Sequence, residues 1–318
     1  MEFLKMEDTL IYYQKKYNMK QLLESIVTKE GYIMVEPAYF EDYDRFITMN
    51  KRINKESMVQ VINNNGSLLV LRPDATTSII KELMPKWENG STLKVFYDST
   101  TFNKASSGII EEKKQFGVEV LGASASESDV AIVQLALSML KAFNKQFIIE
   151  LGNNKFLNGL IEALELSEAD EQTLKEIIYY KNQFNLEKFV TKSIKDSIYF
   201  ELVSDIFKLQ GDFKRIDQML NKYPLNKTML QGLNELKTLS NQLNDSDIKS
   251  FIKFDLAMLS KYDYYNGITF KGYLPNTPSP ILSGGRYNPL TKMFGLEIEA
   301  IGFSLNTSDL LKEALTNE

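Results

Sequence analysis

An arginine, an aspartate and two threonines interrupt an otherwise apolar stretch, LLVLRPDATTSIIKEL, at residues 68–83. A carboxylate next to hydroxyl groups can accept hydrogen bonds from the ammonium group of a ligand. The run before Asp74 has the composition of a strand, and the run after it that of a helix. Asp74 can equally be the N-cap of that helix, with Arg72 as its ion-pair partner. Taken alone, this stretch favours the cap.

A second polar pair lies in KQFGVEVLG, residues 114–122, which we expect to form a strand. Because side chains alternate between the faces of a strand, one face is apolar and the other carries Gln115, Gly117, Glu119 and Leu121. Gln115 and Glu119 are roughly 13 Å apart, and the glycine between them leaves space for a small amphiphilic ligand. In the alternative, Glu119 faces solvent on a half-exposed sheet and Gly117 marks a bulge. This stretch alone favours the alternative.

Three further residues could line a ligand site closer to the C-terminus. Tyr264 and Tyr265 lie in YDYYNGITF, and Arg286 lies in SGGRYNPL. Tyrosines in such a strand more often pack in a core, and GGRY is most simply a tight turn that enters a strand. Each of these signals is weak in isolation.

The composition limits the chemistry that these side chains can support. The chain has 318 residues, 43% of them hydrophobic and 25% charged, and a formal net charge of −5. It contains no cysteine and no histidine, which excludes disulfides, thiolate metal sites and the usual general base near neutral pH. We predict no metal site and no cofactor. Without a signal-peptide pattern or an apolar run long enough to span a membrane, we expect a cytoplasmic protein.

The elements that position these residues alternate between helices and strands over the first half of the chain. A helix is expected over residues 20–30 with Gly31 at its C-terminal cap, and another after the capping-box pair Ser124 and Glu127. Strands are expected in GYIMVEPAYF, SLLVLRPD, KVFYDSTTF, KQFGVEVLG and QFIIEL.

The middle of the chain differs from both ends. Residues 155–245 show helical spacing of leucines with almost no strand character, and strands return in YDYYNGITFKGY, SPILSGGRY and AIGFSLN. We therefore expect an α+β fold in which one discontinuous core, residues 1–154 and 246–318, is interrupted by a helical insertion at 155–245.

Five motifs in this order resemble the catalytic core of histidyl-tRNA synthetase, a class II aminoacyl-tRNA synthetase fold. They are LRPDAT (71–76), QFGVEVLG (115–122), YDYYNGITF (262–270), SGGRYNPL (283–290) and IGFSLNTSDLL (301–311). The likeness spans residues 31–122 and 258–311, and implies an antiparallel sheet flanked by helices. The family has two branches: the synthetases, and a noncatalytic relative that is the regulatory subunit of ATP phosphoribosyltransferase.

Departures from the synthetase pattern favour the second branch. Asn103 stands where the family has a motif 2 arginine for the ATP phosphates, and Ala105 stands where it has an acid. Asp309 and Ser260 align with two further family arginines. Adenylate formation depends on positive charge placed at the phosphates, and the loss of one donor can cost about a hundredfold in rate. We therefore expect no adenylation, and, because the chain ends soon after motif 3, no anticodon-binding domain and no tRNA partner.

The positions that match the synthetase's histidine pocket are mostly usable. By this resemblance, Asp74 replaces a family glutamate at the ligand amino group, and two tyrosines form an aromatic wall. Arg286 is a candidate for the ligand carboxylate, in place of the arginine that is missing at Ser260. The candidate histidine-binding residues are Asp74, Thr76, Gln115, Glu119, Tyr264, Tyr265 and Arg286.

The resemblance implies a noncatalytic subunit that joins a short-form catalytic ATP phosphoribosyltransferase chain in a hetero-oligomer. Such a subunit is required for activity in the first step of histidine biosynthesis, and it helps histidine, as effector, to inhibit that step. A class II core usually pairs with itself, so we expect a homodimer within the assembly.

Two alternatives stay open. One is a divergent histidyl-tRNA synthetase-like enzyme, which amino-acid-dependent pyrophosphate exchange would reveal. The other is a free-standing amino-acid-binding module, which would form no stable complex with the phosphoribosyltransferase.

Overall fold

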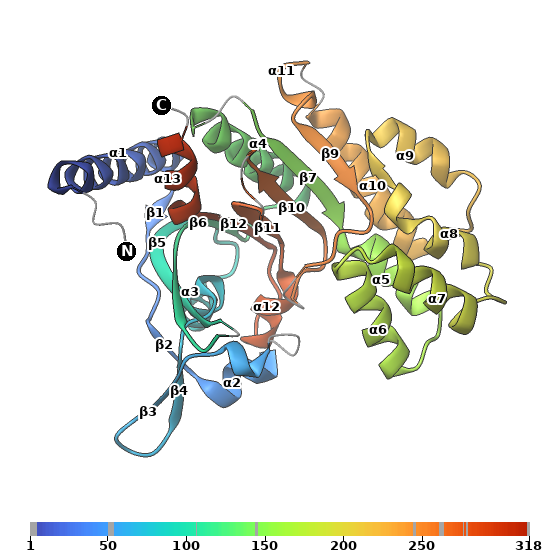
Figure 1. Ribbon diagram of the computed structural model, residues 1–318, viewed down its shortest axis with the longest axis horizontal. Helices are drawn as coiled ribbons and strands as arrows, with labels where there is room; N and C mark the ends of the chain where they lie inside the picture. The colour runs from blue at the N-terminus through green and yellow to red at the C-terminus, as the bar shows by residue number, and fades with distance from the viewer. Residues whose placement is uncertain are drawn as a thin grey trace.

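In the computed structural model, a mixed sheet with nine strands among the described residues forms the centre of the molecule (Figure 1). The structure describes residues 5–49, 54–105, 107–143, 146–243, 246–260, 264–275, 277 and 279–316. The strands follow the order β1 (Ile33–Met34), β5 (Leu93–Lys104), β6 (Ile110–Leu121), β12 (Ala300–Asn306), β11 (Leu282–Arg286), β10 (Ile268–Tyr273), β7 (Ile148–Asn153), β9 (Ile252–Asp255) and β8 (Gln210–Gly211). A smaller sheet beside it consists of β2 (Phe40–Asp42), β4 (Leu68–Leu71) and β3 (Gln60–Ile62).

Helices lie beside both sheets (Figure 1). They are α1 (Met6–Lys29), α2 (Tyr43–Met49), α3 (Ala75–Leu83), α4 (Ala125–Phe143), α5 (Asn154–Ala163), α6 (Glu168–Tyr179), α7 (Gln183–Ser193), α8 (Phe200–Ser204), α9 (Phe213–Leu220), α10 (Lys227–Gln242), α11 (Ser246–Lys249), α12 (Asn288–Met293) and α13 (Thr307–Thr316). Three short 3₁₀ helices, η1 (Lys55–Ser57), η2 (Met84–Lys86) and η3 (Ile206–Lys208), also lie in the part of the chain that the structure describes.

The α+β prediction is confirmed, with one correction to the strand directions. Within the run β5, β6, β12, β11, β10 and β7, each adjacent pair of strands is antiparallel, as expected. However, β1 pairs with β5 and β7 pairs with β9 in parallel. Parallel neighbours need long crossover connections, and both pairs have them: several elements separate β1 from β5, and the helices α5 to α10 separate β7 from β9.

The long hairpin β5–β6 carries two of the predicted strands in unbroken register. The pairing runs from Leu93 opposite Leu121 to Lys104 opposite Ile110, without an extra residue on either side. Gly117 therefore pairs regularly with the opposite strand, and the expectation of a bulge at this glycine is wrong.

The two faces of the sheet differ in character. The apolar side chains of β6, such as Phe116 and Val118, join a large buried cluster with residues of α1 and α4. The opposite face packs Leu121 against α3, α12 and the buried Tyr264 and Tyr287 in a smaller cluster. The predicted polar pair of β6 faces this second side, between the sheet and α3.

The insertion follows β7 and consists mainly of helices α5 to α10, which gather at one side of the sheet (Figure 1). Its strand β8 extends the sheet by pairing with β9. Its buried residues, including Leu160 and Leu236, belong to the same hydrophobic cluster as the sheet. We retain the division into a core and an insertion as a proposal, and its expected end at residue 245 lies outside the described residues.

The helix ends agree with the local sequence signals. Helix α1 ends at Lys29, and Gly31 has a φ of +82°, the left-handed conformation that favours glycine after a helix. The expected helix over 20–30 is therefore confirmed, but it begins much earlier, at Met6. Ser124 donates a hydrogen bond to Glu127 (2.8 Å) at the start of α4. Within the described residues, no helix is long and apolar enough to span a membrane.

Candidate functional site

Asp74 caps helix α3 just after strand β4. Its Oδ2 accepts hydrogen bonds from the backbone N–H of Thr77 (3.0 Å), the hydroxyl of Thr77 (2.6 Å) and the hydroxyl of Tyr264 (3.1 Å). Its Oδ1 accepts a long hydrogen bond of 3.4 Å from the backbone N–H of Thr76. The helix cap is confirmed, and Oδ1 retains acceptor capacity for a further donor.

Arg72 does not pair with Asp74, so that expectation is wrong. Its buried guanidinium donates hydrogen bonds to the carbonyls of Thr100 (2.7 Å) and Ala38 (3.1 Å). It also stacks on the ring of Tyr39, 4.5 Å from the ring centroid. These acceptors come from two other segments of the chain, whereas Asp74 is satisfied by N–H and hydroxyl groups of its own helix and by Tyr264.

Glu119 is the most deeply placed acid of the site, with 1% of its surface exposed. Its Oε1 accepts a hydrogen bond from the hydroxyl of Thr76 (2.7 Å), and its Oε2 accepts one from the hydroxyl of Tyr287 (2.6 Å). Thr76 therefore links the two acids, because its N–H faces Asp74 and its hydroxyl faces Glu119. The alternative that places Glu119 in solvent is wrong.

Two glycines make room for this arrangement. A Cβ atom at Gly302, which pairs with Glu119 across β12 and β6, would lie 1.8 Å from Oε2 of Glu119. A Cβ atom at Gly117 would lie 2.2 Å from the ring of Tyr97. The ring of Tyr97 thus occupies the space beside Gly117, and the prediction of an empty floor for a ligand at that glycine is wrong.

Burial controls the proton affinity of both acids. It raises the pKa of Glu119 to about 8, although the hydrogen bonds from Tyr287 and Thr76 act in the opposite direction. Burial also raises the pKa of Asp74, against the hydrogen bonds from Thr77 and Tyr264. Burial therefore favours the protonated form of Glu119 in this structure. An ammonium group placed beside it would favour the ionised form.

Three of the candidate residues are only partly buried, and they mark the accessible side of the cluster. They are Thr76, Gln115 and Tyr265. The ring of Tyr265 lies 5.0 Å from that of the buried Tyr264, centroid to centroid. Gln115 lies on the same face of β6 as Glu119, opposite Ser99 on β5. These side chains offer a ligand hydroxyl, amide and phenol groups in addition to the acids.

Arg286 is held away from these acids by partners of its own. Its Nε donates a hydrogen bond to Asp129 (3.0 Å), one terminal nitrogen donates to Ser128 (2.8 Å), and the guanidinium forms ion pairs with Asp129 and Glu299. The assignment of Arg286 to a ligand carboxylate stays a prediction, and such a ligand would compete with two protein carboxylates.

Sequence reasoning missed Tyr287, Tyr97 and Gly302 as parts of the site. Tyr287 belongs to the GGRY motif, so the motif signalled its place in the site but not its hydrogen bond to Glu119. Tyr97 could have been found from the alternation of β5 once the hairpin register was known. Among the residues that the structure describes, no cluster of acids is placed to hold a metal ion.

Comparisons with known proteins agree on one family. The histidyl-tRNA synthetase family model matches residues 11–310. The ATP phosphoribosyltransferase regulatory subunit of Clostridium botulinum (strain Langeland) is 34% identical over 304 residues, which cover 93% of this chain and 71% of that protein. The protein of the same description from Acetivibrio thermocellus is 33% identical over 295 residues, which cover 91% of this chain and 70% of that protein.

Solved structures support the same fold. A Bacillus halodurans structure, described as an ATP phosphoribosyltransferase regulatory subunit/histidyl-tRNA synthetase, has a TM-score of 0.85 and 25% identity, and covers 95% of this chain and 79% of its own. A histidine–tRNA ligase subunit from Alicyclobacillus acidocaldarius has a TM-score of 0.84 at 20% identity. The match covers 100% of this chain and 96% of that one. The expected class II synthetase-like fold is confirmed.

Replacement of Glu119 by glutamine is expected to reduce the pH sensitivity of the fold. The folded carboxyl holds its proton up to about pH 8, whereas the ordinary value is 4.5. The wild-type free energy of unfolding should therefore fall as pH rises between these values, with a limiting slope of about 1.4 kcal/mol per pH unit. Glutamine stays neutral, so the stability of Glu119→Gln relative to wild type should grow across this window and level off above it.

Urea unfolding of both proteins from pH 5 to 9 measures this difference. Glu111→Gln, at an exposed position of the same strand, is the matched control and should show no such trend. A stability difference between Glu119→Gln and wild type that does not change with pH would contradict the assignment of a raised pKa to Glu119.

Proposed function

This chain belongs to the histidyl-tRNA synthetase family, in the branch of ATP phosphoribosyltransferase regulatory subunits, and from that premise we propose that it acts in histidine biosynthesis as a noncatalytic subunit. In this proposal it binds a short-form catalytic ATP phosphoribosyltransferase chain in a hetero-oligomer and is required for full activity. Histidine inhibits the assembly through the site around Asp74 and Glu119.

The noncatalytic role is supported by the charges at the nucleotide-facing positions of the family. Asp309 lies in the first turn of α13, where Asn306 donates a hydrogen bond to it (2.7 Å) and Lys312 pairs with it (2.9 Å). Asn103 is a neutral residue on β5 opposite Glu111. Neither position supplies the positive charge that stabilises a transferring phosphate.

The ligand class is supported by the acids and their surroundings. Oδ1 of Asp74 and the carboxyl of Glu119 lie on either side of Thr76, and both can accept further hydrogen bonds. Two acids in a buried setting suit an ammonium group, whose charge would offset theirs. The phenols of Tyr264 and Tyr265 can pack against a ring and exchange hydrogen bonds with an imidazole. Histidine carries both an ammonium group and an imidazole ring.

Inhibition through this site has a thermodynamic requirement. Histidine must bind the inhibited assembly more tightly than the active one, since a ligand shifts an equilibrium only by its difference in affinity for the two states. The coupling is reciprocal, so substrates that favour the active state must weaken histidine binding by the same factor.

Reconstitution tests the function directly. Formation of phosphoribosyl-ATP by the short catalytic chain of the same genome is measured with this protein, without it, and with added histidine. We expect activity to depend on both chains and to fall with histidine. Amino-acid-dependent pyrophosphate exchange by this protein alone serves as the control for a synthetase, and turnover there, or activity indifferent to this protein, would contradict the proposal.

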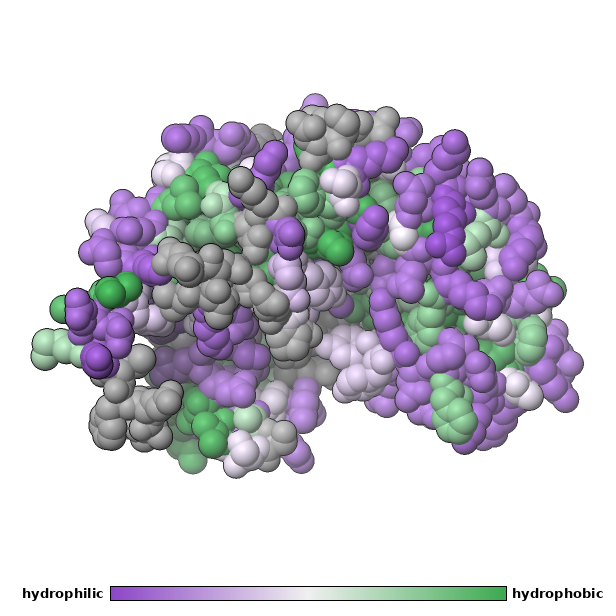
Figure 2. All heavy atoms as spheres, turned by 45° about the horizontal axis from the view of Figure 1, so that its top comes forward, coloured by the Kyte–Doolittle hydropathy of each residue, from purple (hydrophilic) through white to green (hydrophobic). Residues whose placement is uncertain are grey.

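Self-association is supported by apolar side chains at the free end of α1. The first turns of this helix project from the body of the molecule (Figure 1), and Figure 2 shows hydrophobic atoms at the same end. Met6, Leu10 and Ile11 are 81%, 63% and 47% exposed there. Large apolar side chains on a projecting helix are typical of an interface. We propose that a second copy of the chain covers them.

Light scattering coupled to size-exclusion chromatography measures this association. Wild type is expected to have the mass of a dimer, and Leu10→Glu is expected to shift it toward a monomer, because it places a charge at an apolar contact. The matched control is Leu230→Glu, which makes the same change at an exposed leucine of α10. A monomeric wild type, or a Leu10→Glu variant that stays dimeric, would contradict the proposal.

A further inference from the structure

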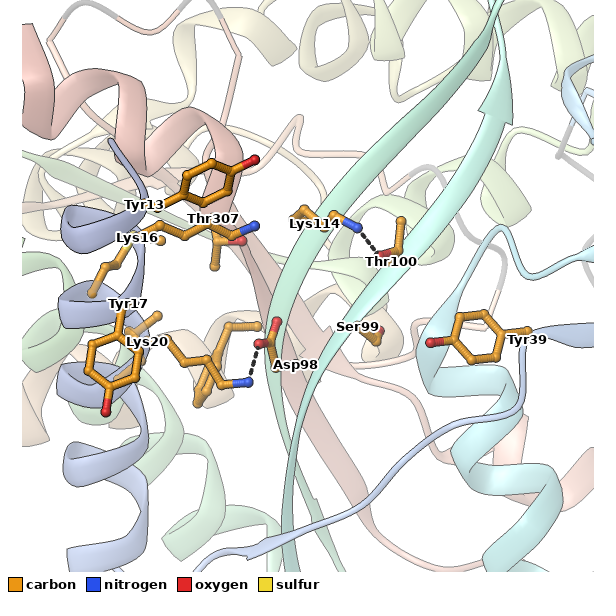
Figure 3. A pocket seen from close by; sticks show the side chains of 13 residues that line it. Tyr13, Lys16, Tyr17, Lys20, Tyr39, Asp98, Ser99, Thr100, Lys114 and Thr307 are labelled. Atoms are coloured by element: carbon orange, nitrogen blue, oxygen red, sulfur yellow. Dashed lines mark hydrogen bonds and ion pairs between the residues drawn. The ribbon is translucent and has the colours of Figure 1, made fainter. Parts of the chain in front are cut away.

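A cavity lies between helix α1 and the β5–β6 hairpin, away from the acids described above. It has a volume of about 420 Å³, which is in the range of sites for small molecules. Figure 3 shows side chains of α1 on one side and side chains of the two strands on the other, with Thr307 at the start of α13 between them. We refer to this cavity as the α1 cleft.

The α1 cleft and the acid site use opposite faces of the same hairpin. Asp98 pairs with Phe116 and Thr100 pairs with Lys114, and all four line the cleft. Glu119 lies an odd number of residues from Phe116 on β6, so its side chain points to the other face. The cleft is therefore a separate site.

Three lysines, Lys16, Lys20 and Lys114, line the cleft, and they outnumber the acids that pair with them. Lys20 pairs with Asp98 at 2.9 Å, and Asp98 is the only acid in the lining among the residues that the structure describes. The ammonium of Lys114 donates to the hydroxyl of Thr100 (2.7 Å) and lies 3.5 Å from the exposed Glu112 at the rim. Within the described part of the chain, Lys16 has neither a hydrogen bond nor an ion pair.

Lys16 reaches the cleft from α1 and Lys114 from β6, and the ammonium of Lys114 is directed to Thr100 (Figure 3). Like charges that converge on a concave surface repel each other, and an anion between them removes that cost. This concentration of positive charge lies on a chain whose formal net charge is −5, so the general composition does not account for it.

Hydroxyl groups and rings complete the lining. Thr100 contributes one hydroxyl, which accepts a hydrogen bond from Lys114 (2.7 Å) and can still donate one. Thr307 adds a second hydroxyl close to the lysines (Figure 3). Tyr13 and Tyr17 are 59% and 58% exposed, and both line the cleft from α1. The hydroxyls can donate to phosphate oxygens, and the rings can pack on a flat group.

From these observations we propose that the α1 cleft binds a phosphate monoester that carries a flat ring. The phosphate lies between Lys16 and Lys114, with hydroxyl donors beside it, and the ring lies against the tyrosines. This site is independent of the histidine proposal, because it uses the other face of the hairpin and other side chains.

Isothermal titration calorimetry with phenyl phosphate, inorganic phosphate and phenol tests this site. Phenyl phosphate should bind more tightly than either of the others, since only it carries both groups. Lys16→Met and Lys114→Met should each weaken its binding about tenfold or more, as a charge-assisted hydrogen bond is lost. Affinity should also fall below about pH 6, where the phosphate gains a proton.

Lys15→Met is the matched control, because it removes the same charge from the neighbouring position of α1, which does not line the cleft. It should leave the affinity unchanged. Circular dichroism melting and light scattering on each variant separate loss of the site from loss of fold or of dimer. Absence of phenyl phosphate binding to wild type, or equal affinity in Lys16→Met, Lys114→Met and Lys15→Met, would overturn the proposal.

Discussion

The candidate site depends on one buried carboxyl group at the centre of the sheet. Glu119 can lie there because Gly302 has no Cβ atom to collide with it and because hydroxyls of Thr76 and Tyr287 satisfy its two oxygens. An unsatisfied buried polar group costs about 1–3 kcal/mol, so the fold must bring α3 and the end of β11 to the same point. The helix cap at Asp74 then fixes where Thr76 lies.

Periodicity alone predicted a large part of this arrangement. The alternation of β6 placed Gln115 and Glu119 on one face, and the residues around Asp74 predicted a helix start, both of which the structure shows. The long apolar segments also predicted the α+β class and the helical middle of the chain, since their period is set by secondary structure itself. The family motifs then indicated which polar residues belong together.

Contacts between segments that are far apart in the sequence could not be predicted from periodicity or motifs. The partners of Arg72 are carbonyls of other segments, and those of Arg286 are acids at the start of α4 and near β12, so neither pairing is encoded in the local pattern. The space beside Gly117 was predicted to be empty, but it is filled by Tyr97 from the opposite strand. A glycine therefore indicates a close approach, whereas the identity of the approaching group requires the register of the sheet.

The most direct test of the account is the affinity of the assembled complex for histidine, measured by titration calorimetry on wild type, Glu119→Ala, Glu119→Gln and the exposed control Glu111→Ala. The account predicts that both changes at Glu119 weaken histidine binding about tenfold or more, because a charge-assisted contact to the ligand is lost, and that the control matches wild type. Comparing the two variants separates loss of the charge from loss of packing. Unchanged histidine affinity in folded, assembled Glu119 variants would contradict the account and remove this site from the mechanism of inhibition.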